Sequence, residues 1–400
     1  MRIGILLTEF PNQTSVAMWR VAVAMRQLGN KVFLVSTRAN SNPETFRDTF
    51  GADIDNVFNA WPPNVAASLI WMLARPIKSL RCWGYILSLH SETISGKLKL
   101  LAVMLGSASL ARYCQRNRIQ HLLVHSMANA AHLVSMAKLL GGCPFSLRLG
   151  GDLEVYGGDH KQKVRQASLI VAAAENNRQQ VIAELGVDPA RVIQSSLGVD
   201  TETFIPIVSD RDPQQPIRLV TVARLNKNKG HQYAIQAVRE LTDRGVACHY
   251  TIVGQGPYRE SIQTQIAELG LQDSITLAGV ADQAAVIGQL QSADIFLLPS
   301  VGLGEATPVS VLEAMACGLP AIVSRIGGTP QMINDWVDGV LVDQADASQI
   351  ADAVQRLEMD SPLYSSVAMA ARQKAVDTYD CKQVAATLLA SIKSIGHDGE

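Results

Sequence analysis

Short apolar runs alternate along the chain with longer amphipathic stretches, which is the pattern of parallel strands joined by helices. The chain opens with RIGILL, continues with the amphipathic stretch SVAMWRVAVAMRQLGN, and returns to an apolar run in KVFLVS. These segments predict a βαβ unit whose helix ends near Gly29. Further buried strands are predicted at HLLVHS, PFSLRLG and ASLIVAAA, and residues 64–117 have the spacing of helices.

The second half of the chain repeats this organisation. Helical patterns such as HQYAIQAVRELTDRG separate six short apolar runs: IRLVTVARL, CHYTIVGQG, SITLAG, ADIFLLPS, LPAIVS and GVLVD. The segment Thr203–Pro216 is rich in proline and polar residues, so we expect it to link two domains. The predicted fold is α/β, with two doubly wound, Rossmann-like domains facing a central cleft. The expected boundaries are 1–200, 201–375, and 376–400 for a last helix that returns to the first domain.

Length and composition agree with a two-domain globular protein. A chain of 400 residues exceeds one ordinary core, and 48% hydrophobic with 18% charged residues is typical of soluble domains. The six cysteines are scattered without a C-x-x-C pair, so no zinc or redox motif is predicted. The first residues form a strand pattern instead of a signal peptide, and no uncharged apolar run reaches the roughly 18 residues of a membrane span. We therefore expect a cytoplasmic protein.

The net charge of −1 conceals an asymmetry between the halves. Residues 1–200 carry 21 Lys and Arg against 13 Asp and Glu, whereas residues 201–400 carry 14 against 23. Opposite charge suggests that the domains face different partners, and an uneven distribution of solvated surface charge explains it equally well. A nucleic-acid partner is not expected.

The segment GLGEATPVSVLEAMACG (302–318) contains two glutamates and no other charge. Glu305 follows an apolar run through a short loop, so we expect it at the carboxyl end of a strand. Thr307 is a good N-cap and Pro308 a good first helical residue, so a helix is predicted to begin there, with Glu313 about a turn and a half inside. Helix N-termini bind phosphate, and carboxylates accept hydrogen bonds from sugar hydroxyls. A capping or solvating role fits the two glutamates equally well.

A second polar cluster follows another predicted strand. In VTVARLNKNKGHQ, Arg224 stands at the end of the strand and Lys229 just before the next helix. An arginine fork and a lysine point charge are a usual pair for a pyrophosphate, although isolated surface cations are common. The loop VGQGPYRE lacks the third glycine of a dinucleotide fingerprint, so we predict a tight strand-to-helix turn there.

At these residues the chain resembles the retaining nucleotide-sugar glycosyltransferases of family 4, which have the GT-B fold. Glu305 and Glu313 match the family's E-x7-E motif, and Arg224 with Lys229-Gly230 matches its G-R-L-x-x-x-K-G segment. VGQGP and EAMACGLPAIVSRIGG match further motifs, and AENNR, SSLGVD and EFPNQTS extend the likeness over most of the chain. The N-terminal loop is most similar to that of the exopolysaccharide branch.

The likeness is interrupted at three positions. Leu149 stands where the family carries the histidine of its H-G-x-D motif, while Gly150 and Asp152 are retained. Arg148 and His125 are the candidates to replace that histidine. Ala306 stands where the family has the glycine of its E-G-x-P motif. Gln331 stands where the family has the glutamate of its G-G-x-P-E motif.

The resemblance implies that the C-terminal domain binds the donor and the N-terminal domain the acceptor. Glu313 would bind the ribose, Arg224 and Lys229 the pyrophosphate, and Glu305 the donor sugar. The further donor-side residues would be Ala306, Thr307, Gly254 and Val280. Asp152 and Arg148 would join Glu305 as catalytic residues, and the acceptor-side residues would be Thr14, Ser15 and His125.

The implied reaction is retaining transfer from a nucleotide-diphosphate sugar to a saccharide or lipid-linked acceptor. A UDP-sugar is the favoured donor and a GDP-sugar the second candidate. Fixed cations and backbone dipoles would stabilise the departing diphosphate, and no D-x-D lies in a suitable loop. We therefore expect neither a catalytic metal nor a cofactor.

Several alternatives remain open. The stretch SLIWMLARPIKSLRCWGYILSLH (68–90) is either ordinary core, which we favour, or a surface that lies against an anionic membrane at its inner face. Other functions for this fold are a sugar-nucleotide epimerase or phosphorylase, and a non-catalytic nucleotide-sugar binder, which Leu149 favours. An NAD-dependent reductase would need G-x-G-x-x-G after its first strand, where the sequence is LLTEFPNQT.

Overall fold

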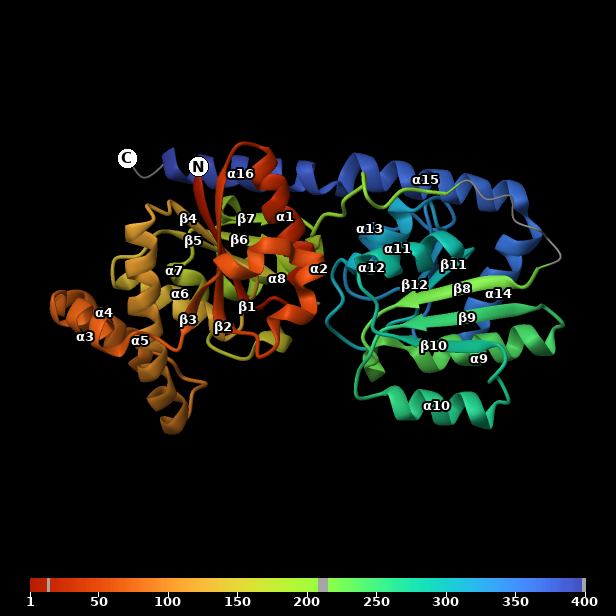
Figure 1. The fold of residues 1–400 in the computed structure, drawn as a ribbon, viewed down its shortest axis with the longest axis horizontal. Helices are drawn as coiled ribbons and strands as arrows, with labels where there is room; N and C mark the ends of the chain where they lie inside the picture. Colours follow the sequence, from red (N-terminus) through yellow and green to blue (C-terminus); the bar gives the residue numbers. More distant parts are fainter. Residues whose placement is uncertain (13–14, 208–214, 398–400) are drawn as a thin grey trace. The chain divides into compact units, whose positions relative to one another are not determined.

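The computed structural model describes residues 1–12, 15–207 and 215–397. The chain divides into two compact units (Figure 1). The first unit comprises Met1–Ser196 together with the end of the chain from Val384, and the second comprises Leu197–Gln383. The separate acceptor and donor roles expected for the two domains remain predictions.

The first unit is built on a parallel sheet of seven strands in the order β3-β2-β1-β4-β5-β6-β7. Its elements, in chain order, are β1 (Arg2–Phe10), α1 (Val16–Gln27), β2 (Lys31–Ala39), α2 (Arg47–Phe50), β3 (Phe58–Trp61), α3 (Val65–Leu73), α4 (Pro76–Leu87), α5 (Ile94–Arg116), β4 (His121–Val124), α6 (Asn129–Leu139), β5 (Phe145–Leu149), α7 (His160–Gln166), β6 (Leu169–Ala172), α8 (Glu175–Leu185) and β7 (Val192–Gln194). The predicted strands are confirmed, and the sequence analysis missed only the two edge strands β3 and β7 among those described. These strands have four and three residues, too few to show a periodic pattern.

The second unit is built on a parallel sheet of six strands in the order β10-β9-β8-β11-β12-β13. Its elements are β8 (Ile217–Val222), α9 (His231–Asp243), β9 (Cys248–Val253), α10 (Arg259–Glu268), β10 (Ile275–Gly279), α11 (Gln283–Ser292), β11 (Ile295–Leu298), α12 (Val309–Ala316), β12 (Ala321–Ser324), α13 (Thr329–Met332), β13 (Val340–Val342), α14 (Ala347–Met359) and α15 (Ser361–Tyr379). Every one of these strands coincides with a predicted apolar run. The predicted α/β fold of two doubly wound domains is thereby confirmed.

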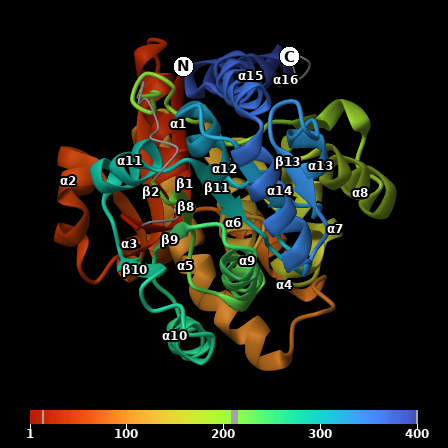
Figure 2. The same ribbon diagram turned by 90° about the vertical axis from the view of Figure 1, so that its right-hand side faces the viewer.

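The strands of the second sheet are apolar throughout because helices cover both of its faces. Alternate residues of the strands pack into two separate clusters, as the two-residue period of a strand requires. One cluster contains the buried residues of α9, α10 and α14, and the other those of α11, α12 and α15. Figure 2 shows α9 and α12 on opposite sides of the sheet.

The last helix, α16 (Cys381–His397), begins in the second unit and continues in the first from Val384. Its apolar side chains Leu388, Leu389 and Ile392 are buried. The chain thus returns to the unit in which it began.

One expectation about the linker is wrong. Phe204, at the start of the expected linker Thr203–Pro216, is fully buried in the hydrophobic core of the second unit. The junction between the units therefore precedes this segment, at Ser196 and Leu197. Residues 208–214 of the expected linker lie outside the described residues.

Phe204→Ala should destabilise the second unit by about 3–5 kcal/mol, because it leaves a cavity in a packed core. Ile205→Ala is the matched control, since Ile205 is exposed and its truncation should change the free energy of unfolding by no more than about 0.5 kcal/mol. Differential scanning calorimetry of both variants makes the comparison. Equal transition temperatures in the two variants would mean that Phe204 is not part of the core.

Candidate functional site

The candidate donor-site residues meet where the strand order of the second sheet reverses. The chain adds β9 and β10 on one side of β8 and then continues with β11 on the other side. Ligands of doubly wound sheets bind at this point, beyond the carboxyl ends of the strands. Arg224 and Lys229 lie in the loop after β8, and Glu305 lies in the loop after β11. The structure therefore brings together two clusters that the sequence separates by about 80 residues.

The two loops are in direct contact. The backbone N–H of Val301 donates to the carbonyl of Asn228 at 2.8 Å. Gly230 has a φ of +69°, and a Cβ atom there would lie 1.7 Å from the carbonyl oxygen of Pro299. Only glycine tolerates both the backbone conformation and this approach. Gly230 thus allows the loop that carries Lys229 to reach the loop that carries Glu305.

Lys229 and Glu305 form an ion pair across these loops. The Lys229 Nζ contacts Oε1 of Glu305, and the Ser300 hydroxyl donates to the same oxygen at 3.0 Å. The side chains of Lys229 and Glu305 are 19% and 7% exposed. The other carboxylate oxygen, Oε2, has no hydrogen-bond partner among the described residues. Glu305 is therefore a fixed, buried carboxylate with one oxygen left for a ligand.

The backbone of Glu305 is held from the opposite side by the loop after β12. The N–H of Gly328 donates to the carbonyl of Glu305 at 3.2 Å. A Cβ atom at Gly327, where φ is +54°, would lie 1.6 Å from the same carbonyl oxygen. The last two glycines of the motif EAMACGLPAIVSRIGG thus position Glu305, a role that the sequence did not predict for them.

The predicted start of the helix after Glu305 is wrong by one residue. α12 begins at Val309, and Pro308 is its N-cap, with a φ of −67° and a ψ of 120°. The Pro308 carbonyl accepts from the N–H groups of Val311 and Leu312. Thr307 lies outside the helix, as expected for a residue that precedes proline, and the extended ψ of Pro308 makes Pro308 the N-cap in its place. Glu313 is buried as the fifth helical residue, slightly more than one turn inside.

Arg224 is exposed at the end of β8, and no ion-pair partner for it is found among the described residues. Its backbone carbonyl lies 3.1 Å from Nε2 of His231, the first residue of α9. Burial lowers the pKa of His231, so the ring is neutral, and it must carry its proton on Nε2 because a carbonyl can only accept. His231 therefore positions Arg224. The sequence did not predict this role, although a histidine directly after Lys229-Gly230 is a signal that could have indicated it.

The loop after β9 is the tight turn that the sequence predicts. A Cβ atom at Gly254 (φ +143°) would lie 2.0 Å from the Ala223 carbonyl oxygen, and one at Gly256 would lie 2.4 Å from that of Leu225. Both glycines allow this loop to pack against the loop that carries Arg224. Val280 follows β10 and is exposed.

In the first unit, Leu149 faces the hydrophobic core. It is the last residue of β5 and is fully buried in the hydrophobic core with Phe145 and Leu147. Strand side chains alternate, so Arg148 lies on the other face of the sheet. The position that carries a histidine in the resembling family is thus a packing position here.

Arg148 lies in β5, and His125 directly follows β4, the neighbouring strand of the first sheet. Arg148 is buried, donates to the Ser195 carbonyl at 2.8 Å, and has no partner for its Nε among the described residues. Burial lowers the pKa of Arg148 to about 10. Burial and then the charge of Arg148 lower the pKa of His125 to about 4, and Nδ1 of His125 has no partner. The pair therefore combines a buried cation with a neutral imidazole.

The remaining candidates of the first unit differ in burial and in hydrogen bonding. The Ser15 hydroxyl is buried and donates to the Asn12 carbonyl at 2.7 Å, so it is used inside its own loop. Asp152 is half-buried and precedes a short 3-10 helix that begins at Leu153. Thr14 lies outside the described residues.

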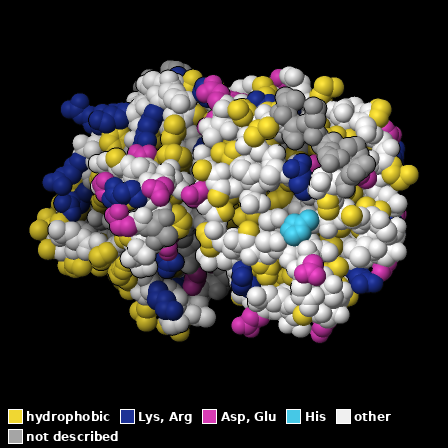
Figure 3. Space-filling view, turned by 45° about the vertical axis from the view of Figure 1, so that its right-hand side comes forward, with side chains coloured by type: hydrophobic (Ala, Val, Ile, Leu, Met, Phe, Trp, Pro, Cys, Tyr) yellow, Lys and Arg dark blue, Asp and Glu magenta, His cyan; other side chains and the backbone are white. Residues whose placement is uncertain are grey.

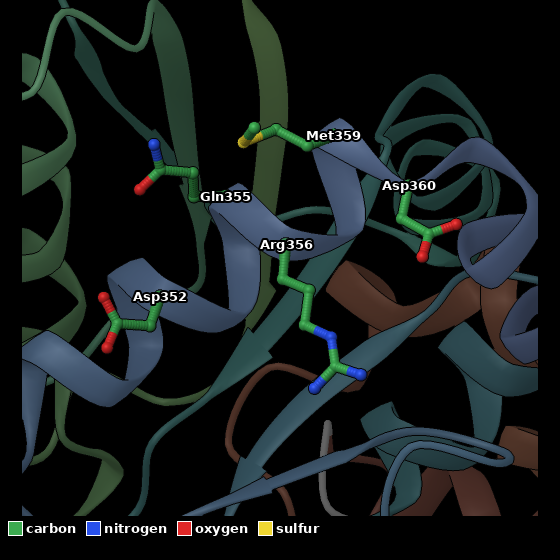
Figure 4. A pocket seen from close by; sticks show the side chains of 5 residues that line it. All are labelled: Asp352, Gln355, Arg356, Met359 and Asp360. Carbon is green, nitrogen blue, oxygen red and sulfur yellow. The ribbon is translucent and has the colours of Figure 1, made fainter.

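A surface hollow elsewhere in the second unit does not have the character of a site. It is lined by Asp352, Gln355, Arg356, Met359 and Asp360, which spread outward along α14 and its end (Figure 4). Arg356 stacks on the ring of Trp336 at 4.0 Å, and Asp352 pairs with Arg244 at 2.6 Å. These charges already have partners within the protein.

Within the described part of the chain, no three His, Cys, Asp or Glu side chains gather as metal ligands would. All six cysteines are free.

Comparison with known proteins finds a family model and relatives that match this chain. Residues 207–374 match the family model described as glycosyl transferases group 1. The chain is 34% identical over 244 residues to the amylovoran biosynthesis glycosyltransferase AmsK of Erwinia amylovora, an alignment that covers 60% of this chain and 59% of that protein. The chain thus spans little more than half the length of this relative.

Two further similarities extend over nearly the whole chain. The putative colanic acid biosynthesis glycosyltransferase WcaL of Escherichia coli K12 is 26% identical over 98% of this chain and 99% of its own length. The crystal structure of Anabaena Alr3699/HepE in complex with UDP and glucose superposes with a TM-score of 0.75 at 16% identity, over 98% of this chain and 100% of that one. The second similarity shows the GT-B fold. Most of the second unit therefore matches the model of the group 1 glycosyltransferases, and these relatives are named as glycosyltransferases of exopolysaccharide biosynthesis.

Proposed function

We propose that this protein transfers a sugar, with retention, from a nucleotide-diphosphate donor to a hydroxyl group of a saccharide or lipid-linked acceptor in exopolysaccharide synthesis. The observation that carries the proposal is the Lys229–Glu305 pair at the reversal point of the second sheet, with the exposed cation Arg224 in the same loop as Lys229. The names of AmsK and WcaL and the UDP bound to HepE support it. A UDP-sugar is accordingly the favoured donor, and a GDP-sugar is the second candidate.

In this proposal the diphosphate binds between the loop after β8 and the start of α12. Arg224 offers a fork of donors and Lys229 a point charge, while the first N–H groups of α12 and those of Ala306 and Thr307 add partial positive charge. Glu313 accepts hydrogen bonds from the ribose hydroxyls. Fixed cations and dipoles of this kind stabilise the charge that develops on the diphosphate as the glycosidic bond breaks.

The two oxygens of Glu305 take different tasks. Oε1 is occupied by Lys229 and Ser300, which fix the carboxylate. Oε2 accepts a hydrogen bond from a hydroxyl of the donor sugar. An ammonium has three donors, so Lys229 contacts Glu305 and a phosphate oxygen together. Lys229 thereby couples the position of the sugar to that of the diphosphate.

The acceptor binds to the first unit, at the carboxyl ends of β1, β4 and β5. Arg148 and His125 lie there with unpaired ring or guanidinium nitrogens, and Asp152 follows β5. A neutral imidazole accepts a proton or a hydrogen bond, and a buried guanidinium attracts an anionic or polar acceptor group. Ser15 shapes the loop after β1 through its bond to Asn12, and the proposed role of its neighbour Thr14 remains a prediction.

The diphosphate site is tested most cleanly with Arg224→Ala. Loss of a charge-assisted contact costs roughly 1.5–3 kcal/mol, so the Kd for UDP should rise about 10- to 150-fold while the melting temperature stays unchanged. Lys227→Ala, an exposed cation of the same loop, is the control and should bind UDP as the wild type does. Lys229→Ala is less clean because it leaves Glu305 buried without its counter-charge. Calorimetric titration that finds equal UDP affinity in both Arg224→Ala and Lys227→Ala would remove the assignment.

The two glutamates should separate in their kinetics. Glu305→Gln should lower kcat by more than it weakens binding of free UDP, because its contact with the sugar strengthens as the bond breaks. Glu313→Gln should weaken donor and free UDP alike and leave kcat nearly intact. The measurements are kcat, donor KM, UDP affinity and melting temperature for both variants. If both variants had wild-type kinetics and lowered melting temperatures, Glu305 and Glu313 would have a structural role only.

Transfer should not need a divalent metal, because Arg224, Lys229 and the start of α12 supply the positive charge that the leaving group requires. Activity measured after treatment with EDTA should equal that of the untreated enzyme. Complete loss of activity that Mg²⁺ or Mn²⁺ restores would contradict this expectation.

A further inference from the structure

Exposed apolar side chains concentrate in one part of the first unit. Of the 20 large hydrophobic residues that are exposed in the described chain, 11 lie between Trp61 and Leu98. Singly scattered exposed hydrophobics are normal, whereas a contiguous patch marks an interaction surface. The patch comprises residues of α3, α4 and the first turns of α5: Val65, Leu69, Ile70, Leu73, Ile77, Leu80, Trp83, Leu87, Ile94 and Leu98.

Helix α4 has two apolar faces. One face carries Cys82 and Ile86, which are buried in the core. Ile77, Leu80 and Leu87 lie on the opposite face and are 69%, 68% and 69% exposed. Our expectation that the stretch 68–90 forms ordinary core is therefore right for only one side of this helix.

The neighbouring helices extend the same surface. α3 packs against both α4 and α5, so the three helices form one layer. Ile70 and Leu73 of α3 and Ile94 at the start of α5 are exposed. α5 is the only described helix that is long and apolar enough to cross a membrane, although the sequence analysis expected none. Because Leu100, Met104 and Ala108 pack in the core, we assign α5 to the protein interior and only its first turns to the surface.

Basic residues border this apolar layer, and acidic residues are almost absent. Residues 61–99, which contain the patch, carry five Lys and Arg and a single acidic residue, Glu92. Lys78, Arg81 and Lys99 are exposed beside the apolar side chains, and Arg75 lies over the ring of Trp71. The space-filling view shows hydrophobic and basic side chains together along its left-hand edge (Figure 3). Long basic side chains that border apolar ones suit an interface between water and anionic lipid.

We propose that the layer formed by α3, α4 and the first turns of α5 binds the surface of an anionic lipid bilayer, with Ile77, Leu80 and Leu87 in the acyl boundary and Lys78, Arg81 and Lys99 at the head groups. A second copy of the chain fits less well, because a two-fold contact would place like charges against each other. A protein partner would need acidic residues around an apolar groove. The surface lies outside the donor site, so it stands or falls independently of the proposed chemistry.

Flotation with vesicles tests this proposal on the full chain. The wild type should float with vesicles of phosphatidylcholine and phosphatidylglycerol but not with phosphatidylcholine alone, and 0.5 M salt should reduce binding. The variant Ile77→Glu/Leu80→Glu should lower the partition coefficient by about tenfold or more, because it places charge in the acyl boundary. Lys78→Glu/Arg81→Glu should lower binding to anionic vesicles by about the same factor.

Met359→Glu/Met369→Glu is the matched control, since both methionines are exposed in the second unit, far along the chain from the patch. This variant should float as the wild type does, and all three variants should keep wild-type melting temperatures and UDP affinity. Equal flotation of Ile77→Glu/Leu80→Glu and wild type would overturn the proposal. The proposal would also be overturned if the wild type did not bind anionic vesicles and instead sedimented as a dimer. In that case the variant Ile77→Glu/Leu80→Glu would sediment as a monomer.

Discussion

The ion pair between Lys229 and Glu305 is the interaction on which the candidate site depends. It joins the loops after β8 and β11, the two strands between which the order of the second sheet reverses. A buried carboxylate is costly unless it is paired and hydrogen-bonded, and here Lys229 and Ser300 meet that requirement through one oxygen. The same arrangement leaves the second oxygen without a partner among the described residues, at the place where doubly wound sheets bind ligands. In the proposed function, one oxygen of this carboxylate makes the stabilising contacts and the other binds the ligand.

Backbone contacts between loops make this pair possible. Gly230 lets one loop approach Pro299, and Gly327 lets the loop after β12 approach the carbonyl of Glu305 from the other side. Side chains at these glycines would collide with backbone atoms that cannot move without displacing the whole loop. The ends of β8, β11 and β12 are therefore locked together before any ligand binds, and pre-organisation of this kind lowers the entropic cost of binding.

The sequence predicted the strands of the second unit and the loops that carry Arg224, Lys229 and Glu305, because a buried parallel strand has a strong local pattern. It did not predict that Lys229 contacts Glu305 or that His231 holds the carbonyl of Arg224, since such contacts join segments whose distance the local pattern does not contain. The sequence predicted Pro308 as the first helical residue, whereas its ψ of 120° places it outside the helix as the N-cap. Helical spacing also could not decide whether α4 was core, because its two opposite faces are both apolar.

The central claim is that a nucleoside diphosphate binds where the second sheet reverses its strand order. Hydrogen–deuterium exchange with and without UDP tests it directly, because bound ligand slows the opening of the backbone that it contacts. UDP should slow exchange in peptides that cover 224–230 and 302–312, and it should leave the hollow on α14 unchanged. Protection confined to α14, or to the first unit, would contradict the claim.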